Sequence, residues 1–273
     1  MSIEPVNKKH ARIELLMEIL GAQKSASISD LAARLDVSHM TIRRDLELLE
    51  TSGKVRLFHG GVALTGGTGT GYRGPYRLDA AEMINHREKE AIARHAASLV
   101  NNGDIVFFDG GSTVEMVPEF IAPGTQITAV CYSYNILSRV LEMENSKIIL
   151  LGGAYHSSSD VFESAESTTL LKRTRITKAF ISANAVQADL GVTCSNQFEV
   201  ATKQAAIESS LARYLLVDSS KFGNVFSSFF AEAGDFHLII TDDHLQPEIF
   251  EEYSSRGILI AQVPVGAEPP DRP

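Results

Sequence analysis

The chain lacks tryptophan altogether, has two cysteines in 273 residues and contains no long apolar run. Cys131 and Cys194 are far apart and lie in apolar contexts, so we expect buried free thiols and no zinc site. The absence of a run of about 18 apolar residues, and of a charged-then-apolar leader, gives no support to membrane spanning or export. We therefore expect a cytoplasmic protein that has no membrane partner.

The composition suits two folded domains. Hydrophobic residues make up 44% of the chain, which supports real cores and argues against disorder for most of it. Residues 1–64 carry nine Lys and Arg against eight Asp and Glu, whereas residues 65–273 carry 16 against 26. A weakly basic N-terminal segment followed by an acidic remainder is typical of a protein that contacts DNA only through that segment, because the acidic part is repelled from the duplex.

A short helix is predicted after Ser38, whose hydroxyl can cap it. Ile42, Leu46 and Leu49 recur at helical spacing and must face a core. The side chains left to face away from that core are Thr41, Arg43 and Arg44. A basic helix of this kind could read DNA, but it could also be the solvated face of a small helical subdomain, and Arg44 could serve only to order the surface beside Asp45.

The flanking segments favour a DNA-binding domain. A second helical pattern opens at Ser29 and leads through the tight turn Asp36-Val37 into Ser38, as in a helix-turn-helix. Residues 12–20 supply a third amphipathic helix, and residues 53–64 alternate apolar and basic side chains around a Gly-Gly turn, which predicts a two-stranded wing. The basic side chains of that wing, which would meet phosphates, are Lys54, Arg56 and His59.

Residues 65–77 hold glycines and a proline without apolar periodicity, which predicts a flexible connection. Beyond it, apolar strand candidates alternate with helix-length segments, so we expect an α/β domain with a mainly parallel sheet. The expected strands are 105–108, 127–130, 147–151, 179–181, 214–217, 237–241 and 258–263. The domains are therefore set at 1–64, a linker at 65–83, an α/β domain at 84–263 and a flexible tail at 264–273.

A glycine-rich turn follows the first of these strands and precedes a helical pattern at 114–120. It consists of Asp109, Gly110, Gly111, Ser112 and Thr113, and it would bring free N–H groups, hydroxyls and a helix end together, which suits phosphate. Such turns are also common where nothing binds. Other candidate residues follow neighbouring strands: Ser133, Asn135, Gly152, Gly153, Asn184 and Lys221. Ligands of open α/β sheets bind at this edge.

Glu199 and Lys203 add an i, i+4 pair on a predicted helix ending near Ser210. Such a pair is often only a surface salt bridge, and Lys221 could be an ordinary loop lysine. The convergence of these groups on one sheet edge favours a binding site. His86, His95, His156 and His237 show no spacing with Cys or carboxylates typical of metal ligands, so neither a metal nor a cofactor is expected.

The run LAARLDVSHMTIRRDLELLETSGKVRLFHGGVAL, residues 31–64, resembles the winged helix of the DeoR family of bacterial sugar-metabolism regulators, with its VSxxTIRRDLxxLExxGxxxRxHGG pattern. The resemblance implies that the DNA-contacting side chains are Ser38, His39, Thr41, Arg43 and Arg44. Met40 joins Ser38 and His39 at the tip that should face bases. Lys54, Arg56 and His59 are the implied contacts to the DNA backbone.

Residues 84–243 resemble the effector domain of the same family through HREKEAIARHAASLV, DGGST, LLGG, the ExxxK of Glu199 and Lys203, and VDSSKFG. That domain resembles ribose-5-phosphate isomerase and senses phosphorylated sugars. The resemblance implies Asp109 for the sugar hydroxyls, residues 110–113 for the phosphate, and Glu199, Lys203 and Lys221 for the rest of the polar ring. Tyr132 and Ala185 depart from the family pattern and add bulk near the expected pocket.

Two functions follow. The first is a DNA-binding regulator, a repressor of a sugar-metabolism operon in most of the family, which reads a double-stranded operator as a homo-oligomer and responds to a phosphorylated sugar. The second is a sugar-phosphate isomerase-like enzyme with Glu199 or Asp109 as general base and Lys221 as electrostatic partner. The recognition helix and wing favour the regulator, since an isomerase gains nothing from them.

Overall fold

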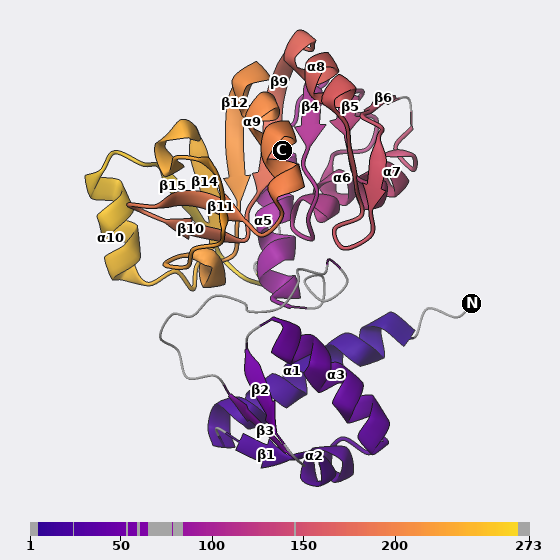
Figure 1. The fold of residues 1–273 in the computed structure, drawn as a ribbon, viewed down its shortest axis with the longest axis vertical. Coiled ribbons are helices and arrows are strands. Elements are labelled where there is room, and N and C mark those ends of the chain that lie inside the picture. Colours follow the sequence, from indigo (N-terminus) through magenta and orange to yellow (C-terminus); the bar gives the residue numbers. More distant parts are fainter. Residues whose placement is uncertain are drawn as a thin grey trace. The chain divides into compact units, whose positions relative to one another are not determined.

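The computed structural model describes residues 5–23, 25–52, 54–58, 61–64, 78, 84–144 and 146–266. The chain divides into two compact units, Met1–Ile84 and Asn85–Pro273, and each is described by itself (Figure 1). The expected linker at 65–83, apart from residue 78, lies outside the described residues. So do His59 and the last seven residues of the expected tail.

The first unit is a trihelical domain with a small antiparallel sheet. Its helices are α1 (Pro5–Gln23), α2 (Ile28–Arg34) and α3 (His39–Thr51), and its strands are β1 (Ser25–Ser27), β2 (Val55–Phe58) and β3 (Gly61–Leu64), in the order β1-β3-β2. The predicted helices and the two-stranded wing are confirmed, whereas β1 was not foreseen. The buried core comprises Ile13, Leu16, Leu20, Leu31, Ala32, Ile42, Leu46, Leu49, Val55 and Val62.

The prediction that Ser29 opens the second helix is wrong. Ser27 is the capping residue, because its side chain accepts a hydrogen bond from the Asp30 amide at 3.0 Å. Ser29 lies in the first turn and is exposed. Both serines can cap a helix, and Ser27 takes the role because β1 ends there and holds its backbone in the extended conformation that a cap needs.

The second unit is built on a seven-stranded sheet with the order β15-β14-β12-β9-β4-β5-β6, in which every neighbouring pair is parallel. This confirms the predicted parallel α/β class. The strands are β4 (Ile105–Phe108), β5 (Thr128–Cys131), β6 (Lys147–Leu150), β9 (Ile176–Ser182), β12 (Ser210–Leu216), β14 (Leu238–Asp242) and β15 (Ile260–Val263).

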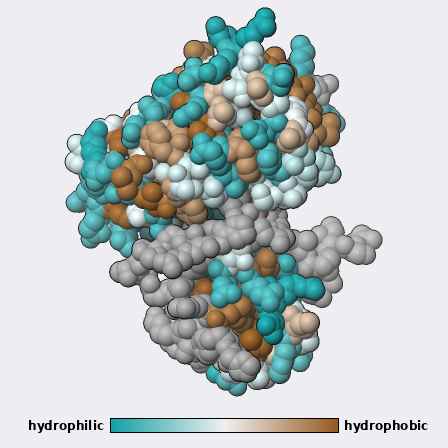
Figure 2. All heavy atoms as spheres, viewed as in Figure 1, coloured by the Kyte–Doolittle hydropathy of each residue, from teal (hydrophilic) through white to brown (hydrophobic). Residues whose placement is uncertain are grey.

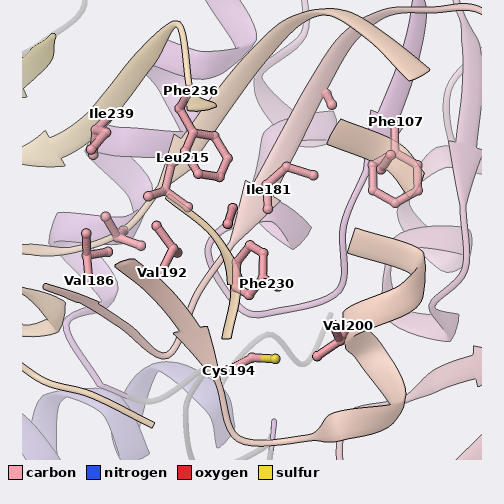
Figure 3. Close-up of a cluster of buried hydrophobic side chains, with 14 of the residues drawn as sticks. Phe107, Ile181, Val186, Val192, Cys194, Val200, Leu215, Phe230, Phe236 and Ile239 are labelled. Atoms are coloured by element: carbon pink, nitrogen blue, oxygen red, sulfur yellow. The ribbon is translucent and has the colours of Figure 1, made fainter. Parts of the chain in front are cut away.

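Helices cover both faces of this sheet and form two cores. On one face lie α5 (His86–Ser98), α6 (Val117–Phe120) and α7 (Tyr134–Val140); on the other lie α8 (Ala165–Arg173), α9 (Gln197–Ser209) and α10 (Pro247–Ser255). Figure 3 shows the second core, in which Phe107, Ile181, Leu215 and Ile239 come from four strands of the sheet and Val200 from α9. The burial of each large apolar side chain of this kind contributes roughly 1.5–3 kcal/mol to the stability of the fold.

Short antiparallel strands flank the main sheet and were not foreseen. One small sheet joins β10 (Ala185–Gln187), β11 (Gly191–Cys194) and β13 (Ser228–Ala231), and a hairpin joins β7 (Ala154–His156) and β8 (Val161–Glu163). Runs of three or four residues carry too little periodicity to be distinguished from loops. The expected helix at 114–120 is a 3-10 turn, η1 (Val114–Met116), followed by α6, in whose first turn Pro118 lies.

Cys131 and Cys194 are buried and unbonded, as the sequence predicts. None of the described helices has the length and hydropathy needed to cross a membrane. On the face of the second unit drawn in Figure 2, hydrophilic and hydrophobic side chains are interspersed.

Candidate functional site

The predicted recognition helix is α3, and Ser38 caps it. Ser38 has extended backbone angles, and its hydroxyl oxygen accepts a hydrogen bond from the Thr41 amide at 3.2 Å. The Ser38 and Thr41 hydroxyls lie 2.8 Å apart, which fixes the first turn. Ile42, Leu46 and Leu49 are buried, so the predicted inward face is the observed one.

The outward face of α3 presents the side chains that could meet a duplex. Met40 is 72% exposed. His39, Arg43 and Arg44 are exposed as well, and Thr41 is half-buried. Arg43 lies 3.4 Å from Glu47 one turn on, a surface ion pair weak enough to be exchanged for a phosphate or a base edge.

Asp45 does not pair with its neighbour Arg44. Its carboxylate is 1% exposed, and the guanidinium of Arg12 on α1 donates to it from Nε at 2.5 Å and from the second nitrogen at 3.3 Å. Arg12 was not among the predicted residues. Its contact holds the orientation of α3 on α1 and leaves Arg44 exposed.

The wing is tied to the same helix. Glu50 of α3 accepts a hydrogen bond from the Leu57 amide of β2 at 2.7 Å. Lys54 precedes β2 and is half-buried, and Arg56 pairs with Ala63 of β3. His59, the third predicted wing contact, lies outside the described residues.

In the second unit the polar residues gather where the strand order reverses. From β4 the chain moves outward to β5 and β6 and then crosses to β9 on the other side of β4, so the carboxyl ends of β4 and β9 form a topological switch point. Asp109 directly follows β4, and Ser182 ends β9. Asp109, one of the predicted site residues, therefore lies at the topological switch point of the sheet.

Asp109 is fully buried and accepts four hydrogen bonds. Tyr132 donates its hydroxyl to Oδ1 at 2.6 Å. Oδ2 accepts from the Ser182 amide at 2.7 Å and the Ser182 hydroxyl at 2.9 Å. Lys203 Nζ completes the set at 2.5 Å from Oδ2. Both oxygens of the carboxylate are therefore engaged by protein donors, and it fixes Lys203.

Glu199 and Lys203 form a buried pair, which overturns the surface salt bridge as an explanation. Lys203 is 1% exposed and Glu199 7%, and their charged atoms lie 3.6 Å apart. Burial would lower the pKa of Lys203, but the carboxylates of Asp109 and Glu199 raise it above its ordinary value. Burial raises the pKa of Glu199 despite the opposing effects of Lys203 and of the Asn196 amide, which donates to it at 2.7 Å.

The turn at 110–113 needs its glycines. A Cβ on Gly110 would lie 2.9 Å from the Val161 side chain, and Gly111 has φ +117°, with the Ser182 hydroxyl 2.9 Å from where its Cβ would be. Ser112 and Thr113 are buried. Lys89 of α5, also buried, donates from Nζ to the Ser112 hydroxyl at 2.9 Å, so a cation and a hydroxyl meet in the turn.

Lys221 lies in a 3-10 turn, η2 (Ser219–Lys221), that follows β12 and is capped by Asp218. Burial would raise the pKa of Asp218, but the ammonium groups of Lys221 and Lys89 and the hydrogen bonds from Ser220 and Asn85 lower it to about 2. Lys89 thus links the 110–113 turn to the 218–221 turn electrostatically.

Among the remaining predicted residues, Ser133 borders this cluster, since its Cβ is 3.7 Å from where a Cβ on Gly110 would lie, and the others make contacts outside it. The Asn135 amide donates to Glu115 at 2.8 Å, and Asn184 accepts from the Ser195 amide at 3.0 Å. The Gly152 carbonyl accepts from the Ser167 hydroxyl at 2.6 Å, and a Cβ on Gly153 would collide with the Glu163 backbone. Ser133 is buried, and its hydroxyl has no hydrogen-bond partner in the described part of the chain.

Sequence reasoning missed Lys89, Ser182 and Asp218. Lys89 had a readable signal, since it shares one helical stripe with Ile92, Ala93 and Ala96, and a lysine on a buried face needs a partner. Tyr132 was expected only to add bulk, and its hydroxyl instead holds Asp109. Ala185 is buried in β10. Among the described residues, no group of His, Cys, Asp and Glu is arranged to hold a metal.

Comparisons with known proteins match both units. A DeoR-like helix-turn-helix domain matches residues 12–66, and a DeoR C-terminal sensor domain matches residues 84–243. The lactose phosphotransferase system repressor of Lactococcus lactis is 32% identical over 253 residues, covering 91% of this chain and 96% of that protein. The uncharacterised HTH-type transcriptional regulator YgbI of Escherichia coli is 32% identical, covering 86% and 90%.

Structural neighbours include ribose 5-phosphate isomerase A of Methanocaldococcus jannaschii, with a TM-score of 0.35 and 15% identity over 50% of this chain and 55% of that one. At this level of similarity the neighbour informs neither substrate nor mechanism. Both family matches and the full-length relatives agree, and the chain belongs to the DeoR family of transcriptional regulators.

Proposed function

We propose that this protein is a DNA-binding repressor of a sugar-metabolism operon, acting in the cytoplasm, whose operator affinity changes when a phosphorylated sugar binds the second unit. The observation that carries the proposal is the turn at 110–113, where glycine backbone, buried hydroxyls and the ammonium group of Lys89 converge. A chain that joins such an anion site to an exposed, capped recognition helix has the parts of a ligand-responsive regulator.

The relatives support the repressor and the ligand class. Several are named lactose phosphotransferase system repressors, from Lactococcus lactis and from staphylococci. These names join a sugar to phosphate transfer, which supports a sugar phosphate as the effector class that we propose for this chain. The particular sugar and operon do not follow from the names.

At the DNA, α3 would enter the major groove. The side chains proposed to reach base edges or nearby phosphates are Ser38, His39, Met40, Thr41, Arg43 and Arg44. Lys54, Arg56 and His59 of the wing would contact the backbone, which orients the protein without reading sequence. A homo-oligomer would read two half-sites, because symmetric operators are usually bound by symmetric proteins.

At the effector site, we propose that residues 110–113, Lys89 and Lys221 bind the phosphate group. Glu199 and Lys203 would face the sugar. Asp109 was expected to bind sugar hydroxyls, but both of its oxygens already accept hydrogen bonds from protein donors, so we assign it the positioning of Lys203. Ser133, Asn135, Gly152, Gly153 and Asn184 stay predictions for the surrounding edge.

We propose no catalytic residue and no cofactor. An isomerase needs a carboxylate base within reach of substrate. Asp109 is fully buried with both oxygens engaged by protein donors. Glu199 would face the sugar, but Asn196 donates to it and Lys203 pairs with it, so neither carboxylate is a free base in this geometry.

The test uses a duplex selected by the full-length protein from a random-sequence pool. Fluorescence anisotropy then measures its dissociation constant with and without each member of a panel of phosphorylated sugars, and the same sugars without phosphate are the controls. A regulator should show a change of about 5- to 150-fold with at least one sugar phosphate. Failure to select any duplex would contradict DNA binding, and an effect of the unphosphorylated sugars alone would contradict the phosphate site.

A further inference from the structure

The carboxylate of Asp218 occupies an unusual position. It lies beyond the carboxyl end of β12 and is 1% exposed. Oδ1 accepts from the side-chain amide of Asn85 at 2.8 Å, from the Ser220 amide at 3.1 Å and from the Ser220 hydroxyl. Oδ2 is buried and has no hydrogen-bond partner within the described ranges. A half-satisfied buried carboxylate is unfavourable unless nearby charge compensates it.

The compensating charges belong to the proposed effector site. Lys89 and Lys221 are the cations that act most strongly on Asp218. Lys89 also donates to Ser112 in the 110–113 turn. Lys89 would therefore serve both an anion in that turn and the carboxylate of Asp218, and Lys221, proposed above as a second phosphate ligand, acts on the same carboxylate. Two neighbouring negative groups that share the same cations weaken each other's binding.

Asn85 connects this carboxylate to the point where the chain enters the second unit. It is the first residue of that unit and the N-cap of α5, with a left-handed backbone (φ 53°, ψ 42°). An Asn at this position usually caps its helix, but this side chain makes no capping bond and instead reaches Asp218 and, at 3.2 Å, the Ser220 hydroxyl. The segment that leads from the DNA-binding unit thus ends on a residue held by Asp218.

We infer that Asp218 is an internal anion that competes with the phosphate of the effector for Lys89 and Lys221, and that Asn85 passes the resulting change to the junction between the units. The inference rests on the proposed function. It supplies what a regulator needs, a contact that differs between the empty and the occupied states, since a ligand with equal affinity for both states shifts nothing.

The competition is tested with Asp218→Asn in the full-length protein. The variant removes the charge and keeps an oxygen that can accept from Asn85. Inorganic phosphate and fructose 6-phosphate are the probes, and isothermal titration measures their dissociation constants. Asp218→Asn should bind both about 10-fold more tightly than wild type, and Asp218→Ser should do the same. Unchanged or weaker binding by both folded variants would overturn the competition.

The transmission is tested with Asn85→Gly, because glycine adopts the left-handed backbone without strain and removes only the side chain. The variant should bind fructose 6-phosphate within about 2-fold of wild type, while the effect of that sugar on the affinity for a selected duplex falls from about 10-fold to almost none. Asn102→Ala, which removes an asparagine at the 101–104 turn before β4, should respond as wild type does.

The outcomes separate the two proposals. If Asn85→Gly responds to fructose 6-phosphate as wild type does, the transmission is wrong and the proposed function stands. If wild type, Asp218→Asn and Asp218→Ser all fail to bind either probe, the proposed effector site fails together with the inference.

Discussion

Arg12 and Asp45 join α1 to the recognition helix through a largely buried ion pair, with Arg12 Nε 2.5 Å from Asp45 Oδ2. The aspartate sits in the TIRRDL motif between two arginines and leucine, where sequence alone offers Arg44 as its partner. The tertiary structure turns it inward instead, and this frees the arginines of α3 for another role.

Replacement of Arg12 by alanine should therefore destabilise the first unit. The change leaves the Asp45 carboxylate buried without its cation, which costs about 2–3 kcal/mol. Urea unfolding followed by circular dichroism should show the transition of the first unit at lower denaturant. Arg43→Ala, in which only an exposed i, i+4 pair is lost, should change stability by less than about 0.5 kcal/mol. Equal effects of the two changes would contradict the assignment.

The exposed arginines of α3 should matter for DNA binding, although the loss of Arg43 should hardly change stability. Arg43→Ala and Arg44→Ala each remove a cation from the exposed face of α3, so each should weaken binding to the selected duplex by about 1–3 kcal/mol. Arg173→Ala, which removes an exposed arginine of the second unit, is the matched control. Wild-type affinity of both α3 variants would exclude this face as the DNA contact.

Lys203 should be essential to the stability of the second unit. Lys203→Met keeps the length of the side chain but leaves Asp109 and Glu199 buried without a cation, at a cost of about 3–5 kcal/mol. Thermal unfolding of the variant should show this loss. The double variant Lys203→Met, Asp109→Asn should recover part of it, because one of the uncompensated charges is gone. A fully stable Lys203→Met protein would mean that the cation is not compensating these carboxylates.

The stability of the second unit should depend on pH through Asp218. Its pKa is about 2 in the folded chain, below the value of 3.8 expected of an ordinary aspartate, so the ionised form stabilises the fold. This contribution to the free energy of unfolding is about 2 kcal/mol. It is fully present above pH 3.8, the pKa of the aspartate in the unfolded chain, and it is lost as the pH falls through the folded-state pKa of about 2. Urea titrations of wild type and Asp218→Asn should differ most near pH 6 and converge toward pH 2. A difference that is constant over this range would contradict the assigned pKa.

Much of the fold follows from local pattern. Ser38 and the spacing of Ile42, Leu46 and Leu49 define α3 without any tertiary information, because a cap and a helical stripe are properties of neighbouring residues. The buried strand before Asp109 and the glycines after it likewise mark a strand-to-helix turn. The short strands β7, β8, β10, β11 and β13 could not be predicted, because runs of three or four residues carry too little periodicity, and β13 forms only where the distant β11 supplies its hydrogen-bond partners.

For the candidate site, too, part could be predicted from the sequence and part depends on the tertiary structure. The sequence by itself proposed the residues at 109–113, Glu199, Lys203 and Lys221 as site candidates, since their glycine, hydroxyl and charged side chains can be identified without a structure. Only the tertiary structure decided their roles. It buried Glu199 and Lys203 rather than exposing them, engaged both oxygens of Asp109 with donors from Tyr132, Ser182 and Lys203, and brought Lys89 to Ser112 across 23 positions of the chain. The physical reason is that ionisation and hydrogen bonding depend on the surroundings of an atom in space, which the order of β4, β5 and β9 in the sheet creates.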